Sequence, residues 1–122
     1  MKEEQILCAC SAYEQKYYLN PRFASLPQQI QEELQILAVT LTEDVGGVFT
    51  MEYDDDGSLY MSTTAKENDF LYDEIGSHLK IKQYRVKYAD LLENLETYYR
   101  LFMLADEKAR KAALEELDDT GD

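Results

Sequence analysis

The sequence predicts a small single α+β domain with N-terminal helices, a central antiparallel β-hairpin and a long C-terminal helix. Its 122 residues fit one domain with one core, and 45% hydrophobic residues are too many for a disordered chain. Apolar residues recur at helical spacing in residues 25–45 and again from Ile81 onward, whereas residues 48–64 alternate apolar and polar around "DDDG". We expect the folded domain to span 1–104, followed by an alanine-rich, charged helical tail over 105–122 that frays at its end.

The N-terminal segment carries a pattern typical of a helix start. Ser11 with Glu14 three residues later has capping-box spacing, which predicts a short helix over 12–19 that Asn20-Pro21 ends. The apolar run "QILCAC" before it fits either a short strand or an extra helical turn, because so short a run has no readable period.

A clearer helix is predicted over residues 25–45. Ser25 and Gln28 repeat the capping-box spacing, and Pro27 falls in the first turn, where its missing N–H costs nothing. Apolar residues then recur every three or four positions and form one stripe: Ile30, Leu34, Leu37 and Leu41. The glycine pair at 46–47 ends the helix.

The two alternating runs "VFTMEYD" and "SLYMSTT" predict the hairpin and its register. If Asp55 and Asp56 form a type I turn and Gly57 takes the left-handed conformation, Asp54 pairs with Ser58. The cross-strand pairs are then Tyr53 with Leu59, Met51 with Met61, and Phe49 with Thr63. A two-residue loop would mix the two faces, so the three-residue loop with its bulge is favoured.

The last third of the chain is expected to be helical. A helix begins with Asn68 or Asp69 as its cap, and Gly76 is a weak point, so its continuity up to Ile81 stays open. From there the apolar residues keep a spacing of three and four: Ile81, Tyr84, Tyr88, Leu91, Leu95, Tyr98, Phe102, Ala105, Ala109 and Ala112. This heptad-like seam predicts one long helix whose alanine end packs weakly.

Charge argues against several classes of function. A formal charge of −13 disfavours nucleic acid and anionic membrane surfaces, which attract Lys and Arg. No apolar run approaches the ~20 residues of a membrane span, and no signal peptide is evident. Two cysteines make no disulfide framework, so we expect a cytoplasmic protein with no cofactor.

The charges are also unevenly spread along the chain. Residues 43–74 carry ten carboxylates and one Lys, whereas residues 78–88 carry four basic residues and no acid. Either the two stretches pair within one molecule, or the acidic strand surface meets a basic partner protein with tyrosine rings as contacts.

Two motifs resemble metal or redox sites and are better explained structurally. Aligning Gly57 with the glycine of an EF-hand loop puts Thr63 where the bidentate Glu is needed, so we expect a hairpin tip and no metal site. Cys8 and Cys10 would share one face of a strand as buried small hydrophobes, and no neighbouring Lys, Arg or His signals a reactive thiolate.

Three functions are compatible with these residues. The leading hypothesis is a non-enzymatic protein-interaction or regulatory module that binds a protein partner through an acidic, Tyr-rich surface, with contacts at Tyr17, Tyr18, Tyr98 and Tyr99. The alternative is a small enzyme or ligand-binding protein with a carboxylate/His cleft formed by Glu43, Asp44, Glu74 and His78. The third, an acidic immunity-type or nucleic-acid-mimic inhibitor, rests on charge alone.

The predicted hairpin suggests self-association. A lone hairpin is marginal in water, so its apolar face must be covered by a helix or its sheet extended by a second copy. Together with the heptad-like seam, this makes a homodimer the expected assembly.

Four blocks of the sequence are similar to a known family. "SAYEQKYYLN" at 11–20, "LTEDVGG" at 41–47, "DEIGSHLKIKQ" at 73–83 and "LETYYRLF" at 95–102 resemble small acidic uncharacterised proteins of clostridia and related Firmicutes. The likeness spans about residues 7–104. It implies a cytoplasmic location and a single domain, and it transfers no site residues.

Overall fold

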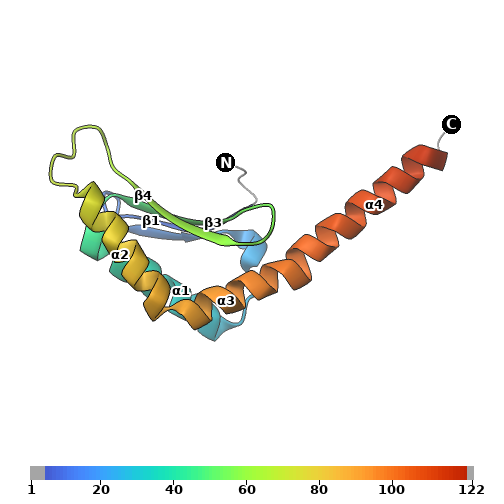
Figure 1. Cartoon of the computed structure of the whole chain (residues 1–122), viewed down its shortest axis with the longest axis horizontal. Helices are drawn as coiled ribbons and strands as arrows, with labels where there is room; N and C mark the ends of the chain where they lie inside the picture. Colours follow the sequence, from blue (N-terminus) through green and yellow to red (C-terminus); the bar gives the residue numbers. More distant parts are fainter. Residues whose placement is uncertain (1–4, 121–122) are drawn as a thin grey trace.

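The computed structural model describes residues 5–120, without the side chains of Glu107 and residues 117–120. The chain forms an α+β domain in which helices pack against one face of a sheet (Figure 1). In chain order the elements are β1 (Ile6–Ser11), β2 (Lys16–Leu19), the 3-10 turn η2 (Pro21–Phe23), α1 (Gln28–Val45), β3 (Val48–Tyr53), β4 (Leu59–Thr64), α2 (Glu74–Lys87), α3 (Ala89–Tyr98), the π-helical segment η3 (Tyr99–Leu104) and α4 (Ala105–Thr120).

The sheet has four antiparallel strands in the order β2-β1-β3-β4. The predicted hairpin register is confirmed, because β3 and β4 pair Tyr53 with Leu59, Met51 with Met61, and Phe49 with Thr63. The loop is the three-residue one: the Asp54 N–H donates to the Ser58 carbonyl at 2.9 Å, and Gly57 has a φ of +85°.

The prediction of a helix over residues 12–19 is wrong. Residues 16–19 form β2, and the open question about residues 5–10 resolves as strand β1. The capping-box serine does accept a hydrogen bond, from the Glu14 N–H to the Ser11 Oγ at 3.2 Å, but it does so inside the turn that joins two strands. A serine that satisfies a backbone donor is equally suited to a turn and to a helix start.

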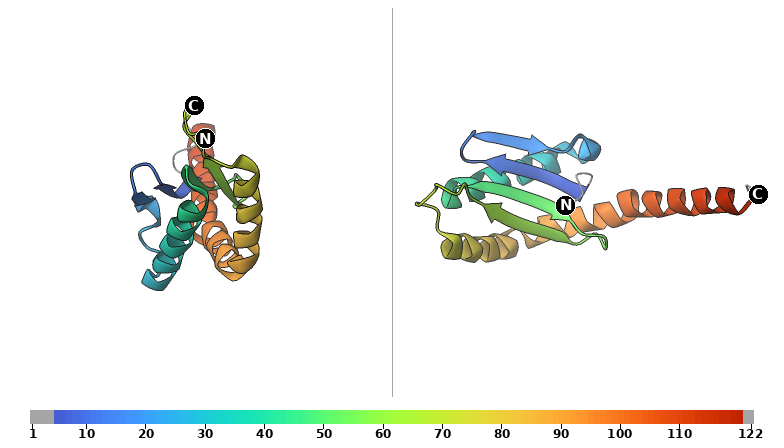
Figure 2. Two further views of the ribbon diagram at one scale, coloured as in Figure 1. Left: turned by 90° about the vertical axis from the view of Figure 1, so that its left-hand side faces the viewer. Right: turned by 90° about the horizontal axis from the view of Figure 1, so that it is seen from above.

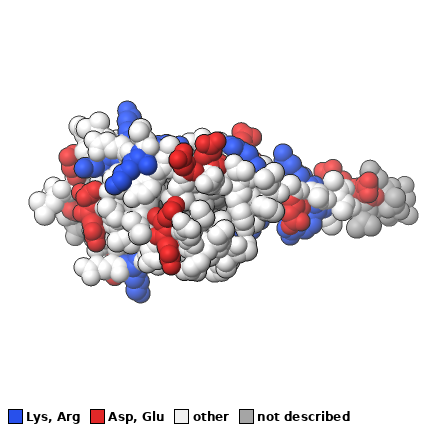
Figure 3. Space-filling model, turned by 90° about the horizontal axis from the view of Figure 1, so that it is seen from below, with Lys and Arg blue, Asp and Glu red and all other residues white. Residues whose placement is uncertain are grey.

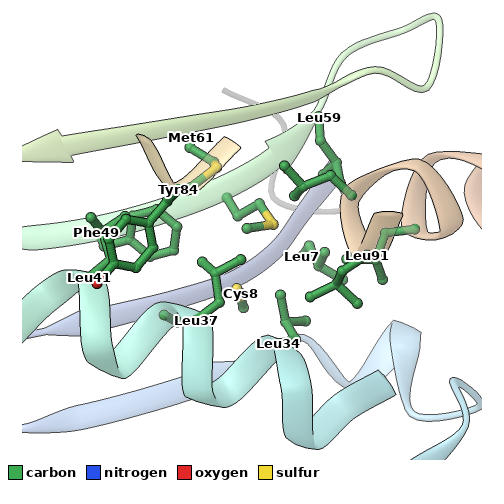
Figure 4. Packing of buried hydrophobic residues seen from close by; sticks show 14 of the residues in the cluster. Leu7, Cys8, Leu34, Leu37, Leu41, Phe49, Leu59, Met61, Tyr84 and Leu91 are labelled. Atoms are coloured by element: carbon green, nitrogen blue, oxygen red, sulfur yellow. The ribbon is translucent and has the colours of Figure 1, made fainter. Parts of the chain in front are cut away.

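The core lies between the sheet and three helices (Figures 2 and 4). Alternate strand residues point into it, namely Cys8, Cys10, Phe49, Met51, Tyr53, Leu59 and Met61. The helices contribute Leu34, Leu37 and Leu41 from α1, Ile81 and Tyr84 from α2, and Leu91 and Leu95 from α3. No helix of the described chain covers the opposite face of the sheet.

Helix α1 ends as expected but begins differently. Its N-cap position is Pro27, without a side-chain cap, and the Ser25 hydroxyl instead lies 2.5 Å from the Tyr98 hydroxyl. At the other end the Gly46 N–H donates to the Thr42 carbonyl at 2.8 Å, and Gly46 has a φ of +75°.

Helix α2 starts later than predicted. Its cap is Asp73, whose Oδ1 accepts from the Gly76 N–H at 3.0 Å, so neither Asn68 nor Asp69 begins the helix. Asp69 instead accepts a hydrogen bond from the Tyr13 hydroxyl at 2.6 Å and holds the loop before α2 beside the β1–β2 turn.

The single long helix predicted from Ile81 is broken at Tyr88, which has a φ of −108° and a ψ of 26° and separates α2 from α3. The chain turns there, so that α2 and α3 both pack under the sheet (Figure 1). Helix α4 then projects away from the body, and its described side chains are exposed. Of the tail end expected to fray, residues up to Thr120 are helical, and residues 121–122 lie outside the described chain.

The hairpin is covered and extended by its own chain. Strands β1 and β2 enlarge the sheet, and the edge of β4 is closed at Leu59, whose N–H donates to Glu96 Oε2 at 2.8 Å and whose carbonyl accepts from Arg85. These contacts occupy the outward backbone groups of one residue of the edge strand. The hairpin is thus covered by helices and extended by strands of its own chain, so a second copy is not needed for either role.

Candidate functional site

The four residues of the carboxylate/His alternative occupy separate environments. The Asp44 Oδ2 accepts a hydrogen bond from the Tyr84 hydroxyl at 2.6 Å, which joins α1 to α2. Burial and this hydrogen bond raise the pKa of Tyr84, so its hydroxyl is protonated and donates at neutral pH. Glu74 and His78 are exposed on α2, and Glu43 is exposed on α1. Within residues 5–120 no hydrogen bond or ion pair links any two of the four.

Glu43 lies at a pocket that none of the other three lines. This cavity of about 490 Å³ lies between α1 and the β1–β2 hairpin. Its lining includes Cys10, Lys16, Tyr17 and Thr42 beside Glu43. The Tyr17 hydroxyl is buried beside the Cys8 thiol, and burial raises its pKa. The cavity therefore offers one carboxylate, one ammonium group and walls that are partly polar and partly apolar.

The four candidate tyrosines differ in exposure. Tyr99 is buried, with its ring stacked on Tyr53 at 4.1 Å between centroids. Tyr17 and Tyr98 are half-buried, and the Tyr98 hydroxyl contacts Ser25. Tyr18 is the most exposed of the four, at 49%, and lies on the uncovered face of the sheet.

The acidic tip folds around its own backbone. The Asp54 Oδ1 accepts hydrogen bonds from the N–H groups of Asp56 at 2.9 Å and Ser58 at 2.8 Å. The Arg100 guanidinium lies on the loop, and its Nε donates to the Asp56 carbonyl at 3.0 Å. Because a carboxylate and a cation serve the turn itself, its geometry is that of a hairpin tip. No group of three or more His, Cys, Asp or Glu in the described part of the chain is placed to hold a metal ion.

The two cysteines are buried on one face of β1 as free thiols, as the strand alternative predicted. Burial raises the pKa of the Cys8 thiol to about 12, so it stays protonated at neutral pH. A protonated, buried thiol is a poor nucleophile and a poor metal ligand. Cys8 is therefore a core residue.

The surface that sequence reasoning missed is the outer side of α2. Three large apolar side chains of this helix are exposed: Ile75 at 76%, Leu79 at 55% and Val86 at 79%. At 100° per residue they lie within about 40° of one another, opposite the buried Ile81 and Tyr84. The helix is therefore apolar on two sides, one packed and one not.

The segment just before α2 also carries exposed apolar side chains. Phe70 is 91% exposed and Leu71 is 97% exposed. We call these five residues the α2 apolar surface: Phe70, Leu71, Ile75, Leu79 and Val86. The helical spacing of the last three was the available signal, but the longer seam from Ile81 drew the prediction to the packed side.

Basic side chains accompany the helical part of the α2 apolar surface, whereas acidic residues flank Phe70 and Leu71 in the preceding segment. Lys80, Lys82, Arg85 and Lys87 all lie on α2 and are exposed. Figure 3 views the helical side of the body, with Lys and Arg gathered toward its upper left, over α2. In a chain of formal charge −13, this helix is a local positive region. Among the described helices, none is long and apolar enough to span a bilayer.

Comparison with known proteins gives a family match. Residues 4–108 match a family described as "Family of unknown function (DUF6145)". No curated protein and no solved structure matches the chain significantly. The match covers α2 and its apolar surface and ends within α4.

Proposed function

The chain belongs to the DUF6145 family, a family of unknown function, and we propose that it is a non-enzymatic protein-interaction module that docks a partner protein on the α2 apolar surface. The observation that carries this proposal is the exposure of five large apolar side chains in one segment, residues 70–86. Large apolar side chains that gather on the surface of a soluble protein commonly mark an interaction site.

Burial of this surface provides the binding free energy. Fully burying a Leu, Ile, Val or Phe side chain is worth about 1.5–3 kcal/mol each before the costs of association. Ile75, Leu79 and Val86 follow a spacing of four and seven on a rigid helix whose other side is fixed in the core. A preorganised row of this kind matches the apolar face of a partner helix.

The charges around the surface define the partner's chemistry. Lys80, Lys82 and Lys87 favour carboxylates on the docking helix, and a basic partner would be repelled there. The proposed partner therefore presents an acidic amphipathic helix.

An acidic, tyrosine-bearing contact surface, proposed from the sequence, has its best support on the uncovered face of the sheet. Tyr18 and Tyr60 are about half exposed there, and Glu52 pairs with Tyr60 across the strands. Exposed tyrosines are enriched at interfaces because they bury a large ring and keep a hydroxyl bonded. We also propose a cytoplasmic location, for which the two free buried thiols are the support.

Photo-crosslinking in the cell of origin tests the docking proposal. A photoreactive residue replacing Leu79 should capture a protein partner, whereas the same residue replacing Ile36 should not. Ile36 is the matched control, because it is 58% exposed on α1 against 55% for Leu79. Equal capture from both positions, or none from Leu79, would contradict the proposal.

The ligand-binding alternative is favoured by one observation, the cavity that Glu43 and Lys16 line. Its mixed lining suits a small molecule with both an amine and an acid group. Amide chemical-shift changes at Val39 and Thr42 on adding glycine, betaine or a short peptide would support it. Unchanged shifts with millimolar probes would leave the interaction module as the sole proposal.

A further inference from the structure

Helix α4 is a second unpartnered element. It runs for 16 residues from Ala105 to Thr120, and every described side chain on it is exposed. Isolated helices of about this length are marginal in water, because tertiary packing normally supplies most of their stability. A projecting helix with no packed face indicates that something covers it in the assembled protein.

The faces of α4 and α2 complement each other in size. Ala105, Ala109 and Ala112 form a row of small residues on α4, and the exposed Leu101 precedes them at the same spacing. The α2 apolar surface presents large side chains at similar intervals. Large residues on one helix pack well against small residues on the other, because the two backbones then approach closely.

The last parts of the two helices carry opposite charges. After Lys111 the sequence of α4 carries Glu115, Glu116, Asp118 and Asp119 and no basic residue, whereas the half with the alanine row also carries Lys108, Arg110 and Lys111. Residues 78–87 of α2 carry four basic residues and no acid. The acidic end of α4 therefore complements the basic part of α2.

We propose that the occupant of the α2 apolar surface is α4 of a second copy, so that two chains form a reciprocal dimer. This inference rests on the proposed docking function of α2. The lengths agree, since 14 residues of α2 and 16 of α4 span about 21 and 24 Å at 1.5 Å per residue. A reciprocal contact closes with two-fold symmetry and doubles the area that one helix pair buries. The dimer leaves the sheet edges untouched and covers both unpartnered helices at once.

Oligomeric mass tests the inference on the full chain. Light scattering should give twice 14.2 kDa at micromolar concentration, and Leu79→Asp should raise the dimer dissociation constant at least about tenfold. Ile36→Asp, the control of matched exposure on α1, should leave it unchanged. Leu79 faces solvent, so circular dichroism should report both variants as folded. A mass of 14.2 kDa at every concentration, or equal dissociation of both variants, would overturn the inference.

Charge reversal tests the pairing of the two helices. Lys82→Glu and Glu115→Lys should each weaken the dimer, because each reverses one of the opposite charges that attract the acidic end of α4 to α2. The effect should shrink in 0.5 M salt. An unchanged dissociation constant in both variants would overturn the assignment of α4 as occupant.

The dimer and the docking function can fail separately. If Leu79 crosslinks a different protein while the chain alone stays at 14.2 kDa, the second copy is excluded and the docking function of α2 stands. If Leu79 captures nothing and the chain is monomeric, both are excluded.

Discussion

Replacing Tyr99 with alanine tests whether this ring belongs to the core. It is 1% exposed and stacks on Tyr53 at 4.1 Å and on Phe23 at 6.4 Å between centroids. Truncating a buried aromatic residue costs about 3–5 kcal/mol, so we expect the free energy of unfolding to fall by about 4 kcal/mol. At 4–8 °C per kcal/mol in a domain of about 100 residues, the melting temperature should fall by roughly 15–30 °C.

Tyr98→Ala is the matched control for this prediction. Tyr98 precedes Tyr99 in the chain but is half-buried, and its hydroxyl lies 2.5 Å from the Ser25 Oγ. Its loss should cost only about 1–2 kcal/mol, from partial ring burial and one hydrogen bond. Urea denaturation followed by circular dichroism gives both values. If Tyr99→Ala costs less than Tyr98→Ala, the reasoning that assigns Tyr99 to the core is refuted.

Three further predictions concern the sheet and the core. Glu96→Ala leaves the part-buried Leu59 N–H without its acceptor, so the free energy of unfolding measured in urea should fall by about 1–3 kcal/mol. Glu96→Gln should recover part of this loss. Equal stability of the wild-type chain and both variants would contradict a stabilising bond between Glu96 and the edge of β4. Burial raises the pKa of the Cys8 thiol from 9.0 to about 12 in the folded chain. As the pH rises, the unfolded chain therefore loses this proton before the folded chain does, and the free energy of unfolding should fall between about pH 9 and pH 12. Cys8→Ala should make that decline shallower, and an unchanged slope would argue against a buried thiol. Gly57 has a φ of +85° in the hairpin loop, so Gly57→Ala should lower the free energy of unfolding by about 1 kcal/mol or more. Ser58→Ala, at the next position, should lower it by less. The reverse order would refute a left-handed conformation at Gly57.

Local pairing rules were sufficient to predict the hairpin and α1. The register of β3 and β4 follows from matching Met51 with Met61, and a slip of one residue would invert both faces. Helix α1 follows from the stripe that Leu34, Leu37 and Leu41 form, all of which are buried.

Tertiary packing decided the elements that were missed. Lys16–Leu19 is a strand because β1 pairs with it, although Ser11 and Glu14 have the spacing of a helix cap. The seam across Tyr88 has no glycine or proline to mark a break, so the turn between α2 and α3 follows from packing both helices under one sheet.

The candidate site was predicted in part. Its basic stretch and the alanine row of the tail were visible in the sequence, but the alanines were expected to pack weakly and the structure leaves them exposed. The outer apolar row of α2 was not separated from the packed one, because a helix with two apolar sides reads as a buried helix from periodicity alone.

NMR spectroscopy of the methyl groups in the isotope-labelled full chain tests the docking function of α2 most directly. In dilute solution a soluble paramagnetic agent should attenuate the methyl signals of Leu79, Val86 and Ile36 alike, since all three are exposed. Unlabelled extract of the cell of origin, or a concentrated unlabelled copy, should then protect Leu79 and Val86 and leave Ile36 attenuated. Continued attenuation of Leu79 and Val86 under both conditions would contradict a docking role for this helix.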